Sequence, residues 1–295
     1  MKIGLYSRVI KEHDRTFVAG IIHYLQQKGV DLVCYDQTKE ALQPSLHHPQ
    51  ALKTFHDAAS FRAYALNYLL SFGGDGTLLD TMRFVQYNCV PVMGINTGTL
   101  GFISSIPRRQ AYEAMEALLA EEVLIDHRSL LQLRSNKPIF DELELALNDF
   151  TIQKRDTGSM IIIKTYLNGQ HLTTYRSDGL VISTPTGSTA YSLSCGGPII
   201  FPDSGTFSIT PVSPHNLSVR PVVVSDESVL SFEVAGRGSN FLVSLDSRYA
   251  VIDYSYQLAV CKAPLVLKTV RLKTQDFVNT LQEKLMWGVD NRNYG

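Results

Sequence analysis

In the first third of the chain, short apolar runs alternate with segments of helical periodicity, and this alternation restricts the folds that the chain can adopt. We interpret four apolar runs as strands, at residues 2 to 6, 30 to 35, 64 to 72 and 90 to 95. Phe17, Ile21 and Leu25 recur four residues apart, which indicates one face of a helix. Gly29 could terminate that helix. Strands that alternate with helices predict a mostly parallel sheet, whose ligands lie at the carboxyl ends of its strands.

Other segments of this region are less regular. Residues 37 to 60 contain two prolines and three histidines and show little periodicity, so we interpret them as a loop with some helix. Thr77 is predicted to cap a helix that runs to Gln86, and Pro107 is predicted to be the first residue of another. The apolar stripe of that second helix is expected at Ala111, Met115, Leu118 and Leu119.

Beyond about residue 125 the pattern changes to short β-rich runs separated by turn residues. The Asn168-Gly169 pair lies between two such runs, which is the strongest short-range signal of a β-hairpin. Further β-rich runs lie at residues 222 to 224, 229 to 234, 241 to 245 and 265 to 272. This part of the chain therefore predicts an all-β, sandwich-like domain. Residues 275 to 287 return to helical spacing and are expected to pack on the first domain.

Composition excludes several classes of function. The formal net charge of −1 argues against binding to nucleic acid, because such binding needs a clear excess of Lys and Arg. No apolar run approaches the roughly 18 to 20 residues of a membrane-spanning helix. The first residues run directly into a strand-like segment without signal-peptide organisation. The four cysteines are dispersed and show no metal-ligand spacing, so we expect free thiols in a cytoplasmic protein.

The first candidate site is the sequence Gly73-Gly74-Asp75-Gly76-Thr77, which follows a predicted strand. Glycines at a strand-to-helix turn allow the backbone to approach a phosphate, and a helix N-terminus offers unpaired N–H groups. A carboxylate among phosphates makes sense if it accepts a hydroxyl proton or helps to hold Mg²⁺. A tight turn with Asp75 as a local cap explains the same residues equally well. The common nucleotide-binding motifs GxxxxGK[ST] and GxGxxG and the kinase HRD motif are absent from the sequence.

The second candidate site runs from residue 176 to residue 198. Five hydroxyl residues lie between positions 183 and 189, directly after the apolar run of residues 180 to 182. Such a loop can form many hydrogen bonds to a sugar or an amide, and Tyr191 could stack on a base. The alternative is a surface loop rich in Ser and Thr that ends in a helix cap.

Together the two candidate sites resemble the NAD kinase family. Other short segments carry the same resemblance: Gly94-Ile95-Asn96, Leu100-Gly101-Phe102, Ala146-Leu147-Asn148-Asp149, Ser213-Pro214-His215-Asn216-Leu217-Ser218 and Arg220-Pro221. The segment of residues 176 to 198 is the most specific of them. The Gly-Gly-Asp-Gly motif is less specific, because phosphofructokinase-like and diacylglycerol-kinase-like enzymes resemble it too.

The resemblance implies an enzyme that transfers the terminal phosphoryl group of ATP to the 2′-hydroxyl of the adenosine ribose of NAD, giving NADP. It implies Mg²⁺ carried by ATP, with no side-chain metal ligand assigned, and a homotetramer or homodimer. The expected fold has a Rossmann-like α/β phosphate-donor domain at residues 1–126 plus 269–295. Residues 127–268 would form a β-sandwich-like NAD-binding domain, with the active site in the cleft between the two domains.

The resemblance also assigns roles to residues. Asp75 would be the catalytic carboxylate, and Gly74 and Gly76 would bind through their backbone. The remaining expected binding residues are Asn148, Asp149, Ser159, Arg176, Asp178, Thr189, Ala190, Tyr191, Ser192, Ser194, Asp246 and Arg248. Among these, Asn148 and Asp149 would bind NAD hydroxyls, although the family usually has Asn-Glu at this position. Asp246 would be a second acid near Asp75. The alternatives are a lipid or sugar kinase that shares the Gly-Gly-Asp-Gly motif and a non-catalytic NAD-binding sensor.

Overall fold

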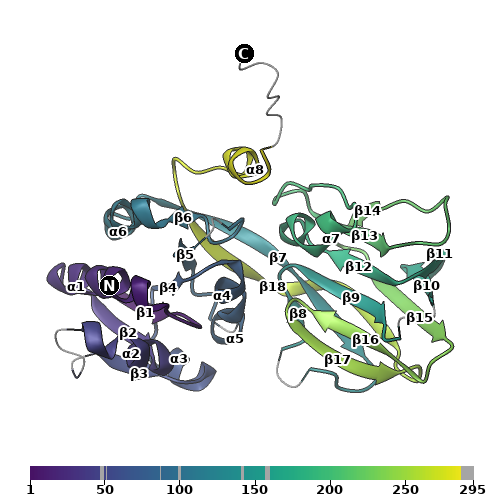
Figure 1. The fold of residues 1–295 in the computed structure, drawn as a ribbon, viewed down its shortest axis with the longest axis horizontal. Coiled ribbons are helices and arrows are strands. Elements are labelled where there is room, and N and C mark those ends of the chain that lie inside the picture. Colours follow the sequence, from purple (N-terminus) through teal and green to yellow (C-terminus); the bar gives the residue numbers. More distant parts are fainter. Residues whose placement is uncertain are drawn as a thin grey trace, which may run out of the picture. The chain divides into compact units, whose positions relative to one another are not determined.

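The chain folds into two compact units (Figure 1). The computed structural model describes residues 1–46, 50, 52–86, 88–98, 101–140, 143–156 and 160–286. Unit 1 comprises Met1–His127 and Leu267–Gly295, and unit 2 comprises Arg128–Val266. Unit 2 is therefore inserted, in sequence, into unit 1.

Unit 1 is built on a parallel sheet with the strand order β18-β5-β4-β1-β2-β3. The strands are β1 (Lys2–Tyr6), β2 (Asp31–Tyr35), β3 (Lys53–Phe55), β4 (Tyr68–Phe72), β5 (Val92–Asn96), β6 (Ile106–Pro107) and the end of β18 (Leu258–Leu272). The helices are α1 (Glu12–Gln27), α2 (Asp36–Leu42), α3 (Ala58–Ala63), α4 (Asp75–Asp80), α5 (Met82–Val85), α6 (Ala111–Leu119) and α8 (Phe277–Leu285). The 3-10 turns η1 (Gln43–Ser45) and η3 (Arg108–Gln110) also lie in the described part of this unit. The prediction of an N-terminal α/β domain is confirmed.

The two faces of this sheet bury different side chains, because successive strand residues point to opposite sides. Ile3 and Leu5 of β1 lie in an aliphatic core with residues of α1 and α6. The opposite face carries an aromatic cluster whose members are Tyr6, Tyr35, Phe55, Phe61 and Phe84. Helices α3 and α5 supply two of these rings, so helices cover both faces of the sheet.

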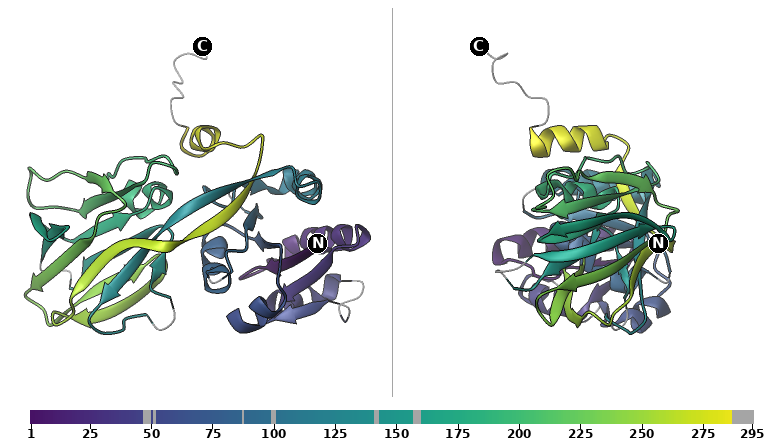
Figure 2. Two further views of the ribbon diagram at one scale, coloured as in Figure 1. Left: turned by 180° about the vertical axis from the view of Figure 1, so that it is seen from behind. Right: turned by 90° about the vertical axis from the view of Figure 1, so that its right-hand side faces the viewer.

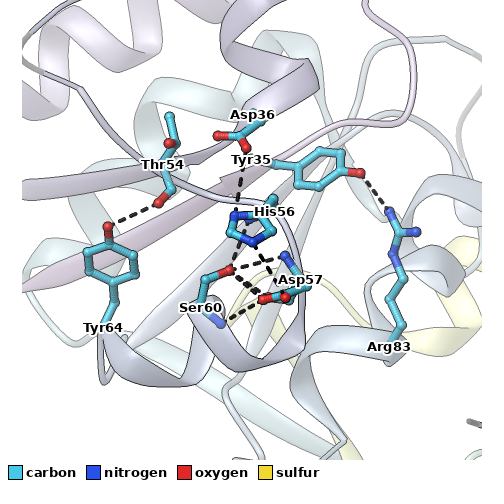
Figure 3. Close-up of polar contacts among 8 residues, drawn as sticks. All are labelled: Tyr35, Asp36, Thr54, His56, Asp57, Ser60, Tyr64 and Arg83. Atoms are coloured by element: carbon cyan, nitrogen blue, oxygen red, sulfur yellow. Dashed lines mark hydrogen bonds and ion pairs between the residues drawn. The ribbon is translucent and has the colours of Figure 1, made fainter.

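Residues 37 to 60 are more ordered than the sequence predicts, since α2, η1, β3 and the start of α3 lie there. Figure 3 shows how polar contacts order part of this segment. The Asp57 carboxylate caps α3 by accepting the Ser60 N–H at 2.7 Å, and the Ser60 hydroxyl oxygen accepts the Asp57 N–H at 3.1 Å. The Tyr64 hydroxyl donates to the Thr54 carbonyl at 3.0 Å. These short elements depend on caps and on packing, so periodicity does not reveal them.

Two predicted helix starts are wrong. Helix α4 begins at Asp75 with Gly74 as its N-cap, so Thr77 lies inside the helix. The helical stretch is also interrupted at Thr81, whose hydroxyl donates to the Leu78 carbonyl at 2.6 Å. Pro107 is not helical: it ends β6 with ψ of 154°, and η3 begins after it.

Unit 2 consists almost entirely of strands. They are β7 (Val123–Ser135, which begins in unit 1), β8 (Leu145–Ala146), β9 (Asp149–Lys154), β10 (Ile161–Leu167), β11 (Gln170–Ser177), β12 (Gly179–Ser183), β13 (Thr206–Val212), β14 (Val222–Ser225), β15 (Leu230–Gly236), β16 (Asn240–Leu245), β17 (Arg248–Asp253) and the first part of β18. The 3-10 turn η4 (Thr186–Thr189) and the short helix α7 (Tyr191–Ser194) lie between β12 and β13. The predicted hairpin is confirmed: β10 and β11 pair antiparallel, and Asn168 and Gly169 have φ of 52° and 83°.

These strands form two sheets. One contains β11-β10-β15-β18 with β7 and β8, and the other has the order β14-β13-β12-β9-β16-β17. Figure 2 shows β7 and β18 running side by side, as their pairing requires. Side chains from both sheets, such as Ile163 from the first and Phe150 from the second, meet in one core. The prediction of a β-sandwich-like domain is confirmed.

Candidate functional site

Asp75 lies at the carboxyl end of β4, where the chain turns into α4. Its carboxylate accepts three successive backbone N–H groups: from Phe102 at 2.8 Å, Ile103 at 3.1 Å and Ser104 at 2.8 Å. A carboxylate has about four lone-pair positions, so about one remains open to a ligand. The backbone therefore fixes the orientation of Asp75 while leaving room for one further hydrogen bond.

A second carboxylate in unit 2 is held in the same way. Asp246 lies in the turn between β16 and β17 with φ of 52°. It accepts the N–H groups of Leu147 at 2.9 Å, Asn148 at 2.7 Å and Asp149 at 3.2 Å. The structure thus brings the expected site residues Asn148, Asp149 and Asp246 together. Since Asp75 belongs to unit 1, its predicted proximity to Asp246 stays a prediction.

Asp149 is a buried acid at the start of β9, with 5% of its surface exposed. Burial and the nearby charge of Asp246 raise the pKa of Asp149 to about 7, because both disfavour its ionised form. Burial also raises the pKa of Asp246, while its three N–H donors and Arg248 oppose that shift. Ionisation of either carboxyl group is therefore disfavoured by burial, and the charge of Asp246 further disfavours ionisation of Asp149.

Arg248, the first residue of β17, is occupied by protein contacts. Its guanidinium donates to the carbonyls of Leu143 and Leu145 and lies 5.5 Å from the centre of the Phe140 ring. Burial lowers the pKa of Arg248, and Asp246 opposes this effect. These contacts give Arg248 a supporting role beside Asp246.

The hydroxyl-rich segment after β12 is mostly engaged within the protein. Thr184 donates from its backbone to Asn148 and from its hydroxyl to Leu147, which fixes the segment against the start of β9. The Ser192 hydroxyl is buried and lies 3.0 Å from the Thr210 hydroxyl. The Thr189 hydroxyl donates to the Thr186 carbonyl at 3.2 Å. These hydroxyl groups therefore stabilise the conformation of the segment.

Among the expected site residues of this segment, Tyr191 and Ser194 are exposed and Ala190 is half-buried. The Tyr191 hydroxyl accepts a hydrogen bond from the Gln153 amide at 2.9 Å. Burial raises the pKa of Tyr191, and Cys195 and Asp149 add to this effect. Asp149 therefore lies close enough to Tyr191 for its charge to disfavour ionisation of the Tyr191 hydroxyl.

Asp178 and Arg176 lie at the junction of β11 and β12. The Asp178 carboxylate pairs with the Lys154 ammonium group at 2.7 Å, and both side chains are partly buried. Arg176 is exposed on β11, and its backbone carbonyl accepts the His215 N–H at 2.8 Å. Gly74 is half-buried and Gly76 is exposed. Ser159, the remaining expected site residue, lies outside the described residues.

Sequence reasoning missed Lys154 and Gln153, which contact the expected site residues Asp178 and Tyr191. Residues 149 to 153 alternate polar and apolar side chains, the pattern of a half-buried strand. That alternation would have placed Asp149, Thr151 and Gln153 on one face of β9.

Two features are absent from the described residues. Within the described part of the chain, no group of three or more His, Cys, Asp and Glu side chains is placed to hold a metal ion. None of the helices in the described ranges is long and apolar enough to cross a membrane.

Comparisons with known proteins agree with this architecture. The model of the ATP-NAD kinase N-terminal domain matches residues 3–123, and that of the ATP-NAD kinase C-terminal domain matches residues 147–272. The NAD kinase of Cytophaga hutchinsonii is 40% identical over 294 residues, which cover 99% of this chain and 100% of the relative. The NAD kinase of Christiangramia forsetii is 37% identical over 297 residues, with the same coverage of both proteins.

Solved structures share the fold at lower identity. The structure of yeast NADH kinase complexed with NADH matches with a TM-score of 0.85 and 21% identity, over 98% of this chain and 88% of that one. The structure of an NAD kinase from Archaeoglobus fulgidus in complex with ATP matches with a TM-score of 0.71 and 23% identity, over 97% and 99%. An α/β unit followed by a β-sandwich, each matched by a kinase family model, defines a two-domain kinase. The chain belongs to the NAD kinase family.

Proposed function

We propose that this chain transfers the terminal phosphoryl group of ATP to the 2′-hydroxyl of the adenosine ribose of NAD, giving NADP. Family membership supports the reaction, since full-length relatives at 40% and 37% identity are NAD kinases. The observation that carries the mechanism is the Asp75 carboxylate, held by three backbone N–H groups at the end of β4. Ligands of such α/β sheets bind at the carboxyl ends of the strands.

In this mechanism Asp75 is the proton acceptor. The ribose 2′-oxygen forms a bond to the γ-phosphorus, the bond from phosphorus to the bridging oxygen breaks, and ADP leaves with the electron pair. A sugar hydroxyl does not ionise at neutral pH, so its proton passes to Asp75 as the new bond forms and then returns to solvent. Positioning of the hydroxyl by the fixed carboxylate supplies a further part of the rate enhancement.

Unit 2 supplies the proposed contacts to NAD. Asn148 and Asp149 bind ribose hydroxyls, Tyr191 stacks on a base and Asp178 offsets the positive charge of the oxidised nicotinamide ring. Support comes from the position of Asp149 and Tyr191 within electrostatic reach of one another. Thr189, Ala190, Ser192 and Ser194 would line the same pocket, while Arg176, Asp246 and Arg248 would border it.

The described residues do not fit a Mg²⁺ site held by the protein. Three of the lone-pair positions of Asp75 are already occupied by N–H donors, and no cluster of three ligand side chains exists in the described ranges. We therefore assign Mg²⁺ to the substrate, as a complex with ATP in which it neutralises part of the polyphosphate charge.

One assay tests the function. The purified chain is incubated with ATP, Mg²⁺ and NAD, and NADP is detected with an NADP-specific dehydrogenase. We expect NADP to accumulate in proportion to time and enzyme. Turnover of a lipid or sugar alcohol in place of NAD would establish the rival kinase, and NAD binding without turnover would establish the sensor.

We also propose a cytoplasmic homo-oligomer, a tetramer or a dimer. The proposal rests on the family resemblance together with the dispersed free cysteines. Light scattering at micromolar concentration tests it. An active particle at the mass of one chain, 32.9 kDa, would contradict it.

A further inference from the structure

The loop of residues 101 to 105 connects the Asp75 carboxylate to the C-terminal segment of the chain. On one side the loop encloses the carboxylate, since the backbone of Phe102, Ile103 and Ser104 donates to it. A Cβ atom added to Gly101 would lie 1.8 Å from Asp75 Oδ1, so only glycine permits this approach. The Ser104 hydroxyl adds a bond of 2.9 Å to the Gly73 carbonyl. The loop and the carboxylate therefore hold each other in position.

On its other side the same loop is bound by Gln275, which follows β18. The Gln275 amide donates to the Ser105 carbonyl at 2.9 Å. The carbonyl of Gln275 accepts a hydrogen bond from the Arg271 guanidinium at 2.8 Å, and Arg271 also pairs with Asp126 at 2.8 Å. The Gln275 backbone is therefore bonded to β18, and the Gln275 side chain is bonded to the loop. Gln275 thus restrains the loop relative to the sheet.

Helix α8 makes a second contact with the loop. The Lys284 ammonium nitrogen lies 4.7 Å from the centre of the Phe102 ring, within the range of a cation–π interaction. The Asp276 carboxylate caps the helix by accepting the Asn279 N–H at 2.7 Å, and Leu281 is buried, with 1% of its surface exposed. These contacts fix the helix that carries Lys284.

A cavity of about 250 Å³ lies beside α8 within unit 1. The residues that line it include Pro107, Arg109, Asn279 and Glu283. Ser105 of the loop and Gln275, which bond to each other, also line this cavity, so the contact between them lies at its wall.

We propose that Gln275 and Lys284 are positioning residues for phosphoryl transfer: by holding the loop of residues 101 to 105, they hold the Asp75 carboxylate in its productive orientation. This inference rests on the proposed function of Asp75. A small displacement of a catalytic group can cost up to about a hundredfold in rate, so loss of either contact should lower kcat. KM for NAD should stay unchanged, because neither residue is assigned a contact with NAD.

The test uses Gln275→Ala and Lys284→Met in the full-length chain, with two readouts. The first is hydrogen exchange of the Phe102, Ile103 and Ser104 amides, without substrates. We expect at least tenfold faster exchange in both variants. The second is steady-state kinetics, in which we expect kcat to fall roughly tenfold with KM for NAD within twofold of the unmodified chain. Lys284→Arg keeps a cation over the Phe102 ring and should restore kcat to within about twofold.

Lys273→Met is the matched control, because Lys273 is an exposed lysine of the same segment. It should change neither readout. Faster exchange with unchanged kcat would overturn the inference, as would a lower kcat with unchanged exchange, or an Arg variant as impaired as the Met variant. If the unmodified chain makes no NADP, the proposed function fails, while the exchange measurement still decides whether Gln275 and Lys284 hold the loop.

Discussion

Asp149 and Asp246 are joined by hydrogen bonds in both directions. The Asp246 N–H donates to the Asp149 carbonyl at 2.9 Å, and the Asp149 N–H donates to the Asp246 carboxylate at 3.2 Å. The second contact orients Asp246, but the proximity of its charge also makes ionisation of the buried Asp149 unfavourable. In the proposed NAD site, the orientation of Asp246 therefore depends on Asp149, and the ionisation of Asp149 depends on Asp246.

The pKa of Asp149, which is raised by burial and by the charge of Asp246, predicts a pH-dependent stability that Asp149→Asn should remove. Because the pKa of Asp149 is raised from 3.8 to about 7 in the folded state, its contribution to stability is fully present below pH 3.8 and is lost as the pH rises through about 7. The free energy of unfolding of Asp149→Asn, relative to the unmodified chain, should therefore increase between these two pH values by a few kcal/mol. Urea unfolding at a series of pH values measures this difference.

Asp31→Asn provides the control for that series, since Asp31 is a partly exposed acid that pairs with Lys53 at 3.3 Å. It should show no comparable rise between the same pH values. A difference between Asp149→Asn and the unmodified chain that is independent of pH would contradict the raised pKa.

Asp75→Asn should abolish most of the activity. The amide cannot accept a proton, and its NH₂ group cannot accept the N–H donors of residues 102 to 104. We expect kcat to fall by roughly 10² to 10⁴, the usual contribution of a positioned general base. The lost hydrogen bonds should cost about 1–3 kcal/mol of unfolding free energy. Kinetics and urea unfolding measure the two effects, and NAD binding by calorimetry should survive. Near-normal turnover would eliminate Asp75 as the base.

The Lys154–Asp178 pair should affect the choice between oxidised and reduced nicotinamide. If Asp178 offsets the charge of the oxidised ring, we expect NAD to be used at least about tenfold better than NADH, which corresponds to about 1.4 kcal/mol. Lys154 neutralises part of the Asp178 charge, so Lys154→Met should widen this ratio roughly fivefold and Asp178→Asn should narrow it. Measured kcat/KM values for both substrates check this. Equal shifts for NAD and NADH in both variants would exclude the proposed role of Asp178.

Gln153 should act on NAD binding through Tyr191. Gln153→Ala removes the hydrogen bond to the Tyr191 hydroxyl, so the ring loses one constraint on its position. We expect KM for NAD to rise about two- to tenfold, which corresponds to 0.5–1.5 kcal/mol, while kcat changes little. Tyr191→Phe removes the same bond from the other side and should give a similar KM. A Phe variant with normal KM and an impaired Ala variant would show that Gln153 acts on another group.

Local signals in the sequence predict part of this structure. The spacing of Phe17, Ile21 and Leu25 predicts α1, and Asn168-Gly169 predicts the β10–β11 hairpin, because each signal lies within a few residues. Helix α3 is only six residues long, too short for a periodic pattern, and depends on the Asp57 cap. The sequence therefore indicates no more than some helix in this region.

The arrangement of the candidate site depends on contacts between residues that are distant in sequence. Asp75 is recognisable from its glycine neighbours, but its donors lie 27 to 29 positions away along the chain. Asp246 is held by backbone groups 97 to 99 positions away. No local pattern encodes such contacts, so the sequence indicates which acids matter but not that the backbone immobilises them.

Unit 2 interrupts unit 1 in sequence. Unit 1 is therefore synthesised first in part but can be completed only after the whole of unit 2 has been synthesised. Strand β5 pairs with β18 through Val92 and Thr269. The 139 residues from 128 to 266 must be synthesised first. At about 5–20 residues per second that takes on the order of ten seconds. During this interval Val92 of β5 lacks its β18 partner, although β6 can already pair with Ile95 and Asn96, while the contiguous unit 2 can already fold. Unit 2 can therefore complete its fold before unit 1 does.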